Sequence, residues 1–310
     1  MIKIAKNLLE NNLSEYNFDR VRYLKSDLIY ILKKYTHSNK KLIKDFESRF
    51  GYSPNLMEPS TFNEKLLLKR IDKIGNNHSF YADKLGVRKY VSETIGDSYL
   101  IPLIDTVKVG EDFIPSKYDT SIIAKASHAS SLNQIIINPK NFDEKRANFL
   151  VKKWLNRDYQ YYWGEWYYSE IVPCVVIEKL LVDDKGSVPN DYKFHVFYGS
   201  SGEPKIYIQV DIARFTEHKR NFYDVDWNQL ELEFEYDKSM TSIEKPYNLD
   251  EMIDVVRKLS KPFQYSRIDL YDFDGRVYFG EITFIPEAGR GRFNNIEIDK
   301  KWGKMLRFEL

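Results

Sequence analysis

The stretch Ser266–Gly289 reads Ser-Arg-Ile-Asp-Leu-Tyr-Asp-Phe-Asp-Gly-Arg-Val-Tyr-Phe-Gly-Glu-Ile-Thr-Phe-Ile-Pro-Glu-Ala-Gly. Two runs of alternating apolar and polar residues flank the pair Asp274-Gly275, which is typical of a hairpin turn. The sequence therefore predicts two antiparallel strands joined at this pair.

The length of the turn determines which side chains share a face of the hairpin, because successive side chains of a strand point to opposite faces. A two-residue turn would pair Asp269 with Gly280 and send Glu281 to the other face. A three-residue loop, Phe273–Gly275, would place both acids and Arg267 on one face. Only this second register also gathers the apolar side chains on a single face, so we expect a turn that is odd in length or bulged.

Two carboxylates and a guanidinium on one face are suited to a hard divalent cation that is bound to phosphates. The alternative is a solvated face whose charges only meet water. Thr283, Pro286 and Gly289 follow in a pattern that a water-facing strand does not require, so we favour the metal site.

Composition limits the class of protein. A net charge of +1 over 310 residues argues against general nucleic-acid binding. The single cysteine, Cys174, excludes a disulfide framework and favours a reducing compartment. No apolar run reaches the ~18 residues that would span a bilayer, and the first residues lack the features of a signal peptide. We expect a soluble, cytoplasmic protein.

Residues 1–75 and 81–95 have helical spacing of their apolar side chains, and Thr61 with Glu64 forms a capping-box pattern. A strand over 121–125 then leads into the small-residue loop 126–131 and a second strand. A lysine beside such a loop can bind phosphates through its charge, and the backbone amides of the loop can bind them as well. A serine-rich loop is also an ordinary turn, so this segment alone leaves both readings open.

Further strands are expected over 175–181, 190–197 and 206–211, and the second of them places Asp191, Lys193 and His195 on one face. Residues 221–247 are expected to be irregular. Helices are expected over 142–162, 249–259 and 296–310.

Taken in order, these motifs resemble the ATP-grasp superfamily over roughly residues 81–300. Arg267-Ile268-Asp269, Asp274-Gly275, Glu281-Ile282-Thr283 and Pro286 match the Arg-x-Asp, Asp-Gly, Glu-x-Asn and Pro of the D-alanine–D-alanine ligases. The whole chain more closely resembles the TupA-like ATP-grasp group, which is associated with bacterial surface polysaccharides. The strings that carry this resemblance are Ala82-Asp83-Lys84, Val87-Arg88, Tyr90-Val91, Lys125-Ala126-Ser127-His128, Asp191-Tyr192-Lys193-Phe194, Arg267-Ile268-Asp269-Leu270-Tyr271 and Phe279-Gly280-Glu281-Ile282-Thr283-Phe284.

The resemblance implies an α+β fold in which two lobes grip ATP, preceded by a helical N-terminal region. The expected domains are 1–110 for the helical region, 111–182 for the small lobe and 183–310 for the C-terminal lobe with the metal-binding hairpin.

The resemblance also implies roles for the matching residues. Those implied to bind ATP are Lys125, Ser127, Ser130, Glu178, Lys179, Leu181, Asp191 and Lys193. Lys125 and Lys193 would contact phosphates, and the Ser127–Ser131 loop would close over them. Asp191 would face the ribose, and the remaining three residues would line the adenine.

The residues implied to bind Mg²⁺ are Asp269, Glu281 and Thr283. Arg267 and Arg214 would steady the acyl phosphate and the tetrahedral intermediate, and His128 would approach the γ-phosphate or the acceptor. Thr283 stands where the ligases have Asn, and a hydroxyl is a poorer ligand than an amide carbonyl. The resemblance therefore leaves open whether one or two metal ions bind.

The activity implied is an ADP-forming, ATP- and Mg²⁺-dependent carboxylate–amine ligase acting through an acyl phosphate. It would attach an amino acid or amine to a uronic acid of a capsule, O-antigen or teichuronopeptide-type polysaccharide or its precursor. Peripheral contact with membrane-bound glycan machinery is a further expectation. The alternatives are an ATP-dependent sugar or glycan kinase, and a glycosyltransferase-associated nucleotide- or glycan-binding protein without catalysis.

Overall fold

The computed structural model describes residues 14–75, 77–183, 186–198, 202–212 and 218–307. The chain divides into two compact units, each assembled from two separate segments. The first unit combines Met1–Ser38 with Pro102–Leu180, and the second combines Asn39–Ile101 with Leu181–Leu310.

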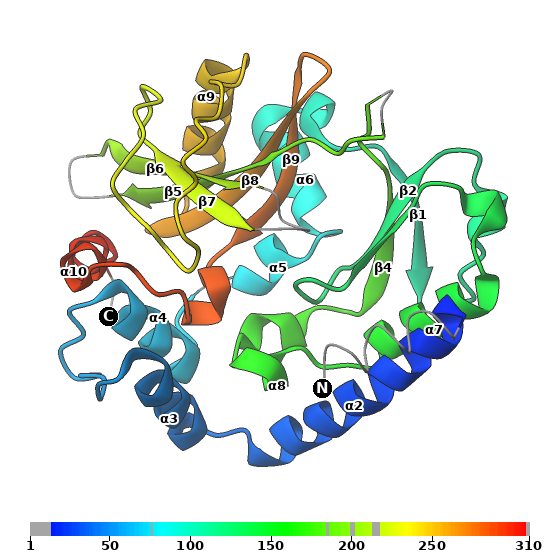
Figure 1. The fold of residues 1–310 in the computed structure, drawn as a ribbon, viewed down its shortest axis with the longest axis horizontal. Coiled ribbons are helices and arrows are strands. Elements are labelled where there is room, and N and C mark those ends of the chain that lie inside the picture. The colour runs from blue at the N-terminus through cyan, green and yellow to red at the C-terminus, as the bar shows by residue number, and fades with distance from the viewer. Residues whose placement is uncertain (1–13, 76, 184–185, 199–201, 213–217, 308–310) are drawn as a thin grey trace. The chain divides into compact units, whose positions relative to one another are not determined.

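The first unit contains a four-stranded antiparallel sheet in the order β1-β4-β2-β3 (Figure 1). Its strands are β1 (Leu103–Lys108), β2 (Ile122–Ala126), β3 (Asn133–Ile136) and β4 (Cys174–Lys179). Its helices are α2 (Glu15–Thr36), α7 (Glu144–Leu155) and α8 (Gln160–Trp163), with short 3₁₀ turns η2 (Pro115–Lys117), η3 (Pro139–Asn141) and η4 (Trp166–Glu170).

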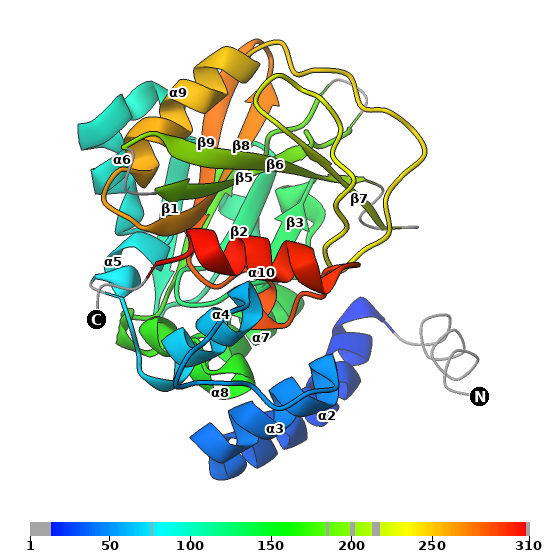
Figure 2. The same cartoon turned by 90° about the vertical axis from the view of Figure 1, so that its left-hand side faces the viewer.

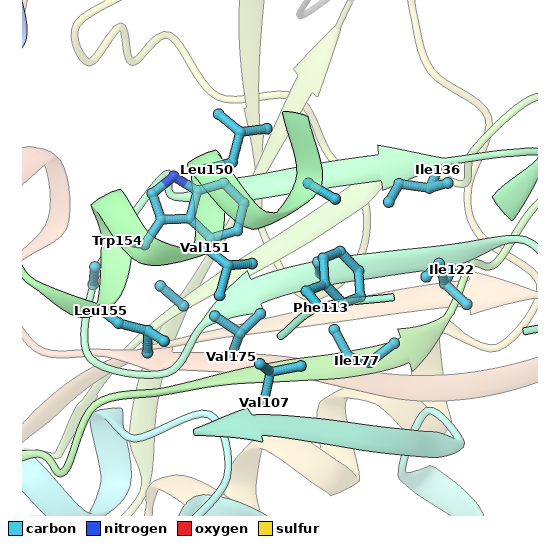
Figure 3. Packing of buried hydrophobic residues seen from close by; sticks show 14 of the residues in the cluster. Val107, Phe113, Ile122, Ile136, Leu150, Val151, Trp154, Leu155, Val175 and Ile177 are labelled. Carbon is cyan, nitrogen blue, oxygen red and sulfur yellow. The ribbon is translucent and has the colours of Figure 1, made fainter. Parts of the chain in front are cut away.

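The core of this unit lies between the sheet and α7. Val175 and Ile177 of the central strand β4 are completely buried, and Leu150 and Trp154 of α7 pack in the same cluster (Figure 3). Asp143 caps α7 by accepting hydrogen bonds from the first free amides of the helix. The apolar run of β4 therefore forms the interior strand that the sequence predicts.

The second unit contains a five-stranded antiparallel sheet in the order β7-β6-β5-β8-β9. Its strands are β5 (Asp191–Tyr198), β6 (Pro204–Ile212), β7 (Lys219–Tyr223), β8 (Tyr265–Phe273) and β9 (Arg276–Thr283). Its helices are α3 (Asn39–Phe50), α4 (Phe62–Ile71), α5 (His78–Ala82), α6 (Val87–Ile95), α9 (Leu249–Ser260) and α10 (Ile296–Met305), with 3₁₀ turns η1 (Asp97–Tyr99) and η5 (Pro286–Gly289).

Helices pack on both faces of this sheet. The amphipathic helix α9 lies along β5 and β8 (Figure 1), with Met252, Val256 and Leu259 fully buried. Helices α4 and α10 pack side by side (Figure 2). Trp302 of α10 is completely buried and its ring lies 5.0 Å from the ring of His195 in β5.

Several local expectations are confirmed and others are corrected. The Thr61–Glu64 capping box begins α4, with both of its hydrogen bonds present. The helix expected over 81–95 is instead two helices, α5 and α6. The one expected over 142–162 is likewise α7 followed by α8. Part of the segment expected to be irregular forms strand β7, in which the buried residues Arg220, Asn221 and Phe222 pair with β6.

The observed elements give the α+β class expected from the sequence. The domain limits of 1–110, 111–182 and 183–310 remain a prediction. No helix in the described part of the chain is long and apolar enough to cross a membrane.

Candidate functional site

The hairpin of β8 and β9 has the face arrangement that the sequence predicts, but a different feature produces it. Phe273 pairs with Arg276, so the turn is the two-residue Asp274-Gly275, with φ values of 52° and 69°. The predicted three-residue loop is therefore wrong. The register shifts between Asp269 and Leu270, because Gly280 is an extra residue in β9.

This β-bulge brings the acids together. Asp269 pairs with Glu281 and Arg267 pairs with Thr283 across the two strands. A bulge residue at position 280 must be small: a Cβ added to Gly280 would lie 2.9 Å from the Asp269 carbonyl oxygen and 3.0 Å from Cε2 of Tyr271. Glycine at this position is thus a requirement of the shared face.

Gly280→Ala is expected to lower the free energy of unfolding by about 1–3 kcal/mol, because the Cβ would push against backbone, and to lower activity by shifting Glu281. Chemical denaturation and a turnover assay would measure the two effects. Gly110→Ala is the control. It places a Cβ in open space at a φ of 93° and tests backbone strain without touching the hairpin. Wild-type stability and activity in Gly280→Ala would contradict the importance of the bulge.

Arg267 connects the polar side chains of this face. Its Nε and Nη2 donate to Oδ1 and Oδ2 of Asp269 at 2.7 and 2.9 Å, which is a bidentate pair. The same Nη2 donates to Oε1 of Glu281 at 2.9 Å and to Oγ1 of Thr283 at 3.1 Å. One guanidinium therefore contacts both acids and the threonine.

Strand β5 adds a second cation. Lys193 pairs with Asp269 in the β5–β8 register, and its Nζ lies 2.7 Å from Oδ2 of Asp269 and 3.6 Å from Oδ2 of Asp191. His195 lies two residues along and pairs with Arg267. The alternation predicted for this strand, with Asp191, Lys193 and His195 on one face, is confirmed.

The two acids of the hairpin differ in environment. Asp269 is buried, which alone would raise its pKa, but the charges of Arg267 and Lys193 lower the pKa to about 2. The Arg267 pKa is raised above its usual value, because these acids outweigh the effect of burial. The Glu281 side chain retains 32% of its exposure. Both pKa shifts hold the Asp269–Arg267 pair charged at neutral pH, and Glu281 is the acid open to solvent.

A buried hydrogen-bond network extends this face across the sheet. His195 donates from Nε2 to Gln209 at 2.9 Å and accepts from the Tyr265 hydroxyl at 2.9 Å. Gln209 donates to Asp211, which also accepts from Nε of Arg220 at 2.6 Å. Burial lowers the His195 pKa to about 3, so this histidine is neutral and structural.

Arg220 is the main residue of this face that the sequence analysis missed. It bonds Asp211 on the adjacent strand, and its Nη1 lies 2.9 Å from Oε1 of Glu287. The aromatic pair Phe222-Tyr223 directly after Arg220-Asn221 was the available signal for a strand. It was hidden by the polar residues that surround it.

The donor set of the hairpin fits one hard cation. Asp269, Glu281 and Thr283 offer oxygen atoms only, which Mg²⁺ and Ca²⁺ prefer. Among the described residues no group of three or more His, Cys, Asp or Glu side chains could hold a metal ion. A cation here would take two carboxylates and a hydroxyl from the protein, and the remaining ligands would come from water or from a bound phosphate.

The first unit carries its own charged pair. Lys125 of β2 and Glu178 of β4 lie on one face of the sheet, with Nζ and Oε2 2.7 Å apart. Both side chains are mostly buried, at 14% and 10% exposure. The two residues that the resemblance links to phosphate and to adenine are thus neighbours.

Other predicted residues of this unit have partners within the fold. Ser127 is fully buried, and its Oγ accepts from the Cys174 amide at 3.3 Å. His128 is 2% exposed, with Nε2 3.1 Å from the Trp154 carbonyl oxygen. Ser130 is half-buried, and its hydroxyl lies 3.4 Å from that of Ser131.

The remaining predicted residues are Lys179, Leu181 and Arg214. The Lys179 side chain is exposed, and its amide donates to the Pro102 carbonyl oxygen at 3.0 Å. Leu181 is 9% exposed. Arg214 lies outside the described residues.

Comparison with known protein families identifies the chain. The model of the TupA-like ATP-grasp family matches residues 64–307. The chain belongs to this family. The ATP-grasp family expected from the sequence and the α+β class that the resemblance implies are thus confirmed. A comparison with curated proteins found no match.

The TupA-like chain is also similar to solved structures of ligases. The D-alanine–D-alanine ligase of Helicobacter pylori is 14% identical, with a TM-score of 0.45 over 74% of this chain and 62% of that one. The D-alanyl-alanine synthetase A of Vibrio cholerae is 12% identical, with a TM-score of 0.41 over 79% and 63%. An ATP complex of the Bacillus anthracis D-alanine–D-alanine ligase is 17% identical, with a TM-score of 0.36 over 66% and 55%. The chain spans less than two thirds of the length of each.

Proposed function

We propose that this chain is an ATP- and Mg²⁺-dependent ligase that joins the carboxylate of a uronic acid to an amine. The uronic acid would belong to a bacterial surface polysaccharide of the capsule, O-antigen or teichuronopeptide type, or to its precursor. The amine would come from an amino acid or another small molecule. The observation that supports the proposal is the shared face of Arg267, Asp269, Glu281 and Lys193 in a chain of the TupA-like family.

Roles follow from the chemistry of the side chains. Lys125 and Lys193 would bind ATP phosphates, because each is an ammonium group that already contacts acidic oxygens, Lys125 on Glu178 and Lys193 on Asp269 and Asp191. Asp191 would face the ribose. Glu178, Lys179 and Leu181 would line the adenine, and Ser130 would cover the phosphates. The domain limits given above are part of the same proposal.

Asp269, Glu281 and Thr283 would hold Mg²⁺, which when bound offsets the negative charge of the phosphates. Glu281 is the acid that could turn from Arg267 to a metal ion, because its side chain is partly exposed and Arg267 contacts only one of its oxygens. Asp269 is held on both oxygens by cations. The protein thus positions one acid rigidly and leaves the other free to bind.

The reaction has two balanced steps. A carboxylate oxygen attacks the γ-phosphorus, the bond to the β-phosphate oxygen breaks, and ADP leaves. The amine then attacks the acyl carbon and loses a proton, and phosphate departs with the original carboxylate oxygen. Both steps spread negative charge over oxygen atoms, which fixed cations stabilise without reorganising.

Arg267 would stabilise this negative charge. Its bidentate pair with Asp269 fixes the plane of the guanidinium, and its Nη2 faces Glu281 and Thr283. Arg214 would assist from the segment outside the described residues. Because Ser127 and His128 are buried with partners in the first unit, a role for them toward substrates requires that the loop rearrange.

The proposal is tested by incubating the protein with ATP, MgCl₂, a glucuronate-containing oligosaccharide and a mixture of amino acids. The expected products are ADP, phosphate and an oligosaccharide whose mass has increased by one amino acid minus water. A phosphorylated sugar without free phosphate would establish a kinase instead. Nucleotide binding without any product would establish a binding protein.

A further inference from the structure

Among the described residues, Lys69 of α4 is a buried lysine that has no hydrogen-bond or ion-pair partner. The residue is 6% exposed, although it is charged. Within the described part of the chain, its ammonium makes no hydrogen bond and no ion pair with any carboxylate. Buried charges in proteins are normally paired or bound to an ion, so this lysine requires an explanation.

Two other lysines of the same unit, one half-buried and one buried, have acceptors for their ammonium groups. Lys65, one turn earlier on α4, donates to the carbonyl oxygens of Gly303 and Leu306, each at 2.7 Å. Lys193 pairs with Asp269. The fold can therefore provide acceptors for a lysine, and none is placed at position 69.

The surroundings of Lys69 hold further positive or neutral groups. Its Nζ lies 5.9 Å from the centre of the Phe284 ring, on which His78 of α5 stacks at 3.7 Å. Burial and the neighbouring Lys69 lower the His78 pKa to about 2, so that imidazole is neutral. Arg70, next on α4, is also buried and lies against the turn at Gly289. Among the described residues, no carboxylate lies within ion-pair distance of the Lys69 ammonium.

The position of the cluster indicates where the anion comes from. Phe284 directly follows Thr283, the residue that shares Arg267 with Glu281. Gly289 ends the turn η5, which follows at once, and Leu66 and Arg70 of α4 lie against it. Lys69 is thus beside the segment that continues from the proposed metal-binding strand.

We propose that Lys69 binds a carboxylate of a substrate that stays charged throughout the reaction. The inference rests on the proposed ligase function. Two sources share this chemistry: the α-carboxylate of the incoming amino acid, and a uronate on a sugar next to the one that reacts. The substrate carboxylate supplies the negative charge that the described residues do not place beside Lys69.

The predicted properties of Lys69 are opposite to those of a structural lysine. Lys69→Met replaces an unpaired buried charge with an apolar side chain of similar length, so the thermal midpoint of the substrate-free protein should rise. The same variant should raise the KM of one carboxylate substrate by roughly 10- to 100-fold and leave the KM of ATP unchanged. The substrate whose KM rises identifies the source of the anion.

Two comparisons sharpen this experiment. Replacing the amino acid by its amide should raise KM in the wild type and have no effect in Lys69→Met. If the anion is instead a neighbouring uronate, its methyl ester should raise KM in the wild type and have no effect in Lys69→Met. Lys73→Met is the matched control, because Lys73 is exposed at the end of the same helix and its loss should change neither stability nor KM.

The pH dependence of kcat/KM distinguishes loss of the Lys69 charge from a folding defect. Burial lowers the Lys69 pKa to about 8, so kcat/KM for the carboxylate substrate should fall above that pH as the ammonium loses its proton. His78, whose ring stacks on Phe284 beside Lys69, is neutral and does not titrate in this range. Lys69→Arg should retain binding and lose this step in the profile, since a guanidinium stays charged.

The outcomes separate the two proposals. If the wild type forms no amide product, the ligase function fails. If it forms the product but Lys69→Met is less stable, or has unchanged KM values for both carboxylate substrates, the role of Lys69 is overturned. A higher thermal midpoint together with a selective rise in one KM would establish it.

Discussion

Asp269→Asn is expected to lower the free energy of unfolding by about 3–5 kcal/mol and to remove ATP turnover. The carboxylate is buried between Arg267 and Lys193, with hydrogen bonds of 2.7 to 2.9 Å to both. The amide would leave Arg267 paired with Glu281 alone, and Lys193 with Asp191 at 3.6 Å. Removing the acid that two buried cations share is strongly destabilising. Chemical denaturation and ADP formation would be measured on the same sample.

Asp272→Asn is the matched control for this change. Asp272 lies on the same strand, but its oxygens accept from the backbone amide and the side chain of Asn248 rather than from a cation. Its loss should have a small effect on stability and none on turnover. A stable Asp269→Asn protein would show that the two cations do not depend on this acid.

Glu281→Gln is expected to separate activity from stability. The Glu281 side chain is 32% exposed and receives only one bond from Arg267, so its neutralisation should change the free energy of unfolding by no more than about 1 kcal/mol. Turnover should fall by roughly 100-fold or more, because the acid proposed to bind the metal loses its charge. The Mg²⁺ concentration that gives half-maximal rate should rise as well.

The pair of variants tests the two acids against each other. We expect Asp269→Asn to lose both stability and activity, whereas Glu281→Gln should lose activity alone. If Glu281→Gln kept wild-type turnover and Mg²⁺ dependence, the metal-binding role of the hairpin would be wrong.

The sequence predicted the elements of this face better than the geometry that aligns them. Alternation in 265–283 was sufficient to predict two strands, and the need for one apolar face required Asp269 and Glu281 to share the other face. The β-bulge that aligns the two acids was not predictable. The bulge needs a residue at position 280 that leaves no Cβ against the Asp269 carbonyl oxygen of the opposite strand, and local propensity does not report such contacts.

Other differences have the same origin. His128 and Ser127 follow a short strand in a polar loop, and only the packing against Trp154 and Cys174 shows that they are buried. Lys69 is one of many lysines in a helical stretch, and its lack of a partner depends on α5 and the turn after β9. These features arise from tertiary contacts, which composition and spacing do not specify.

The central claim is that a carboxylate is activated as an acyl phosphate on the face formed by Arg267, Asp269, Glu281 and Lys193. It is tested most directly by supplying a uronate acceptor with ¹⁸O in its carboxylate, together with ATP, MgCl₂ and the amine. The account predicts that the released phosphate contains one ¹⁸O atom, and that Glu281→Gln abolishes this transfer. Phosphate released without ¹⁸O while an amide forms would contradict the account.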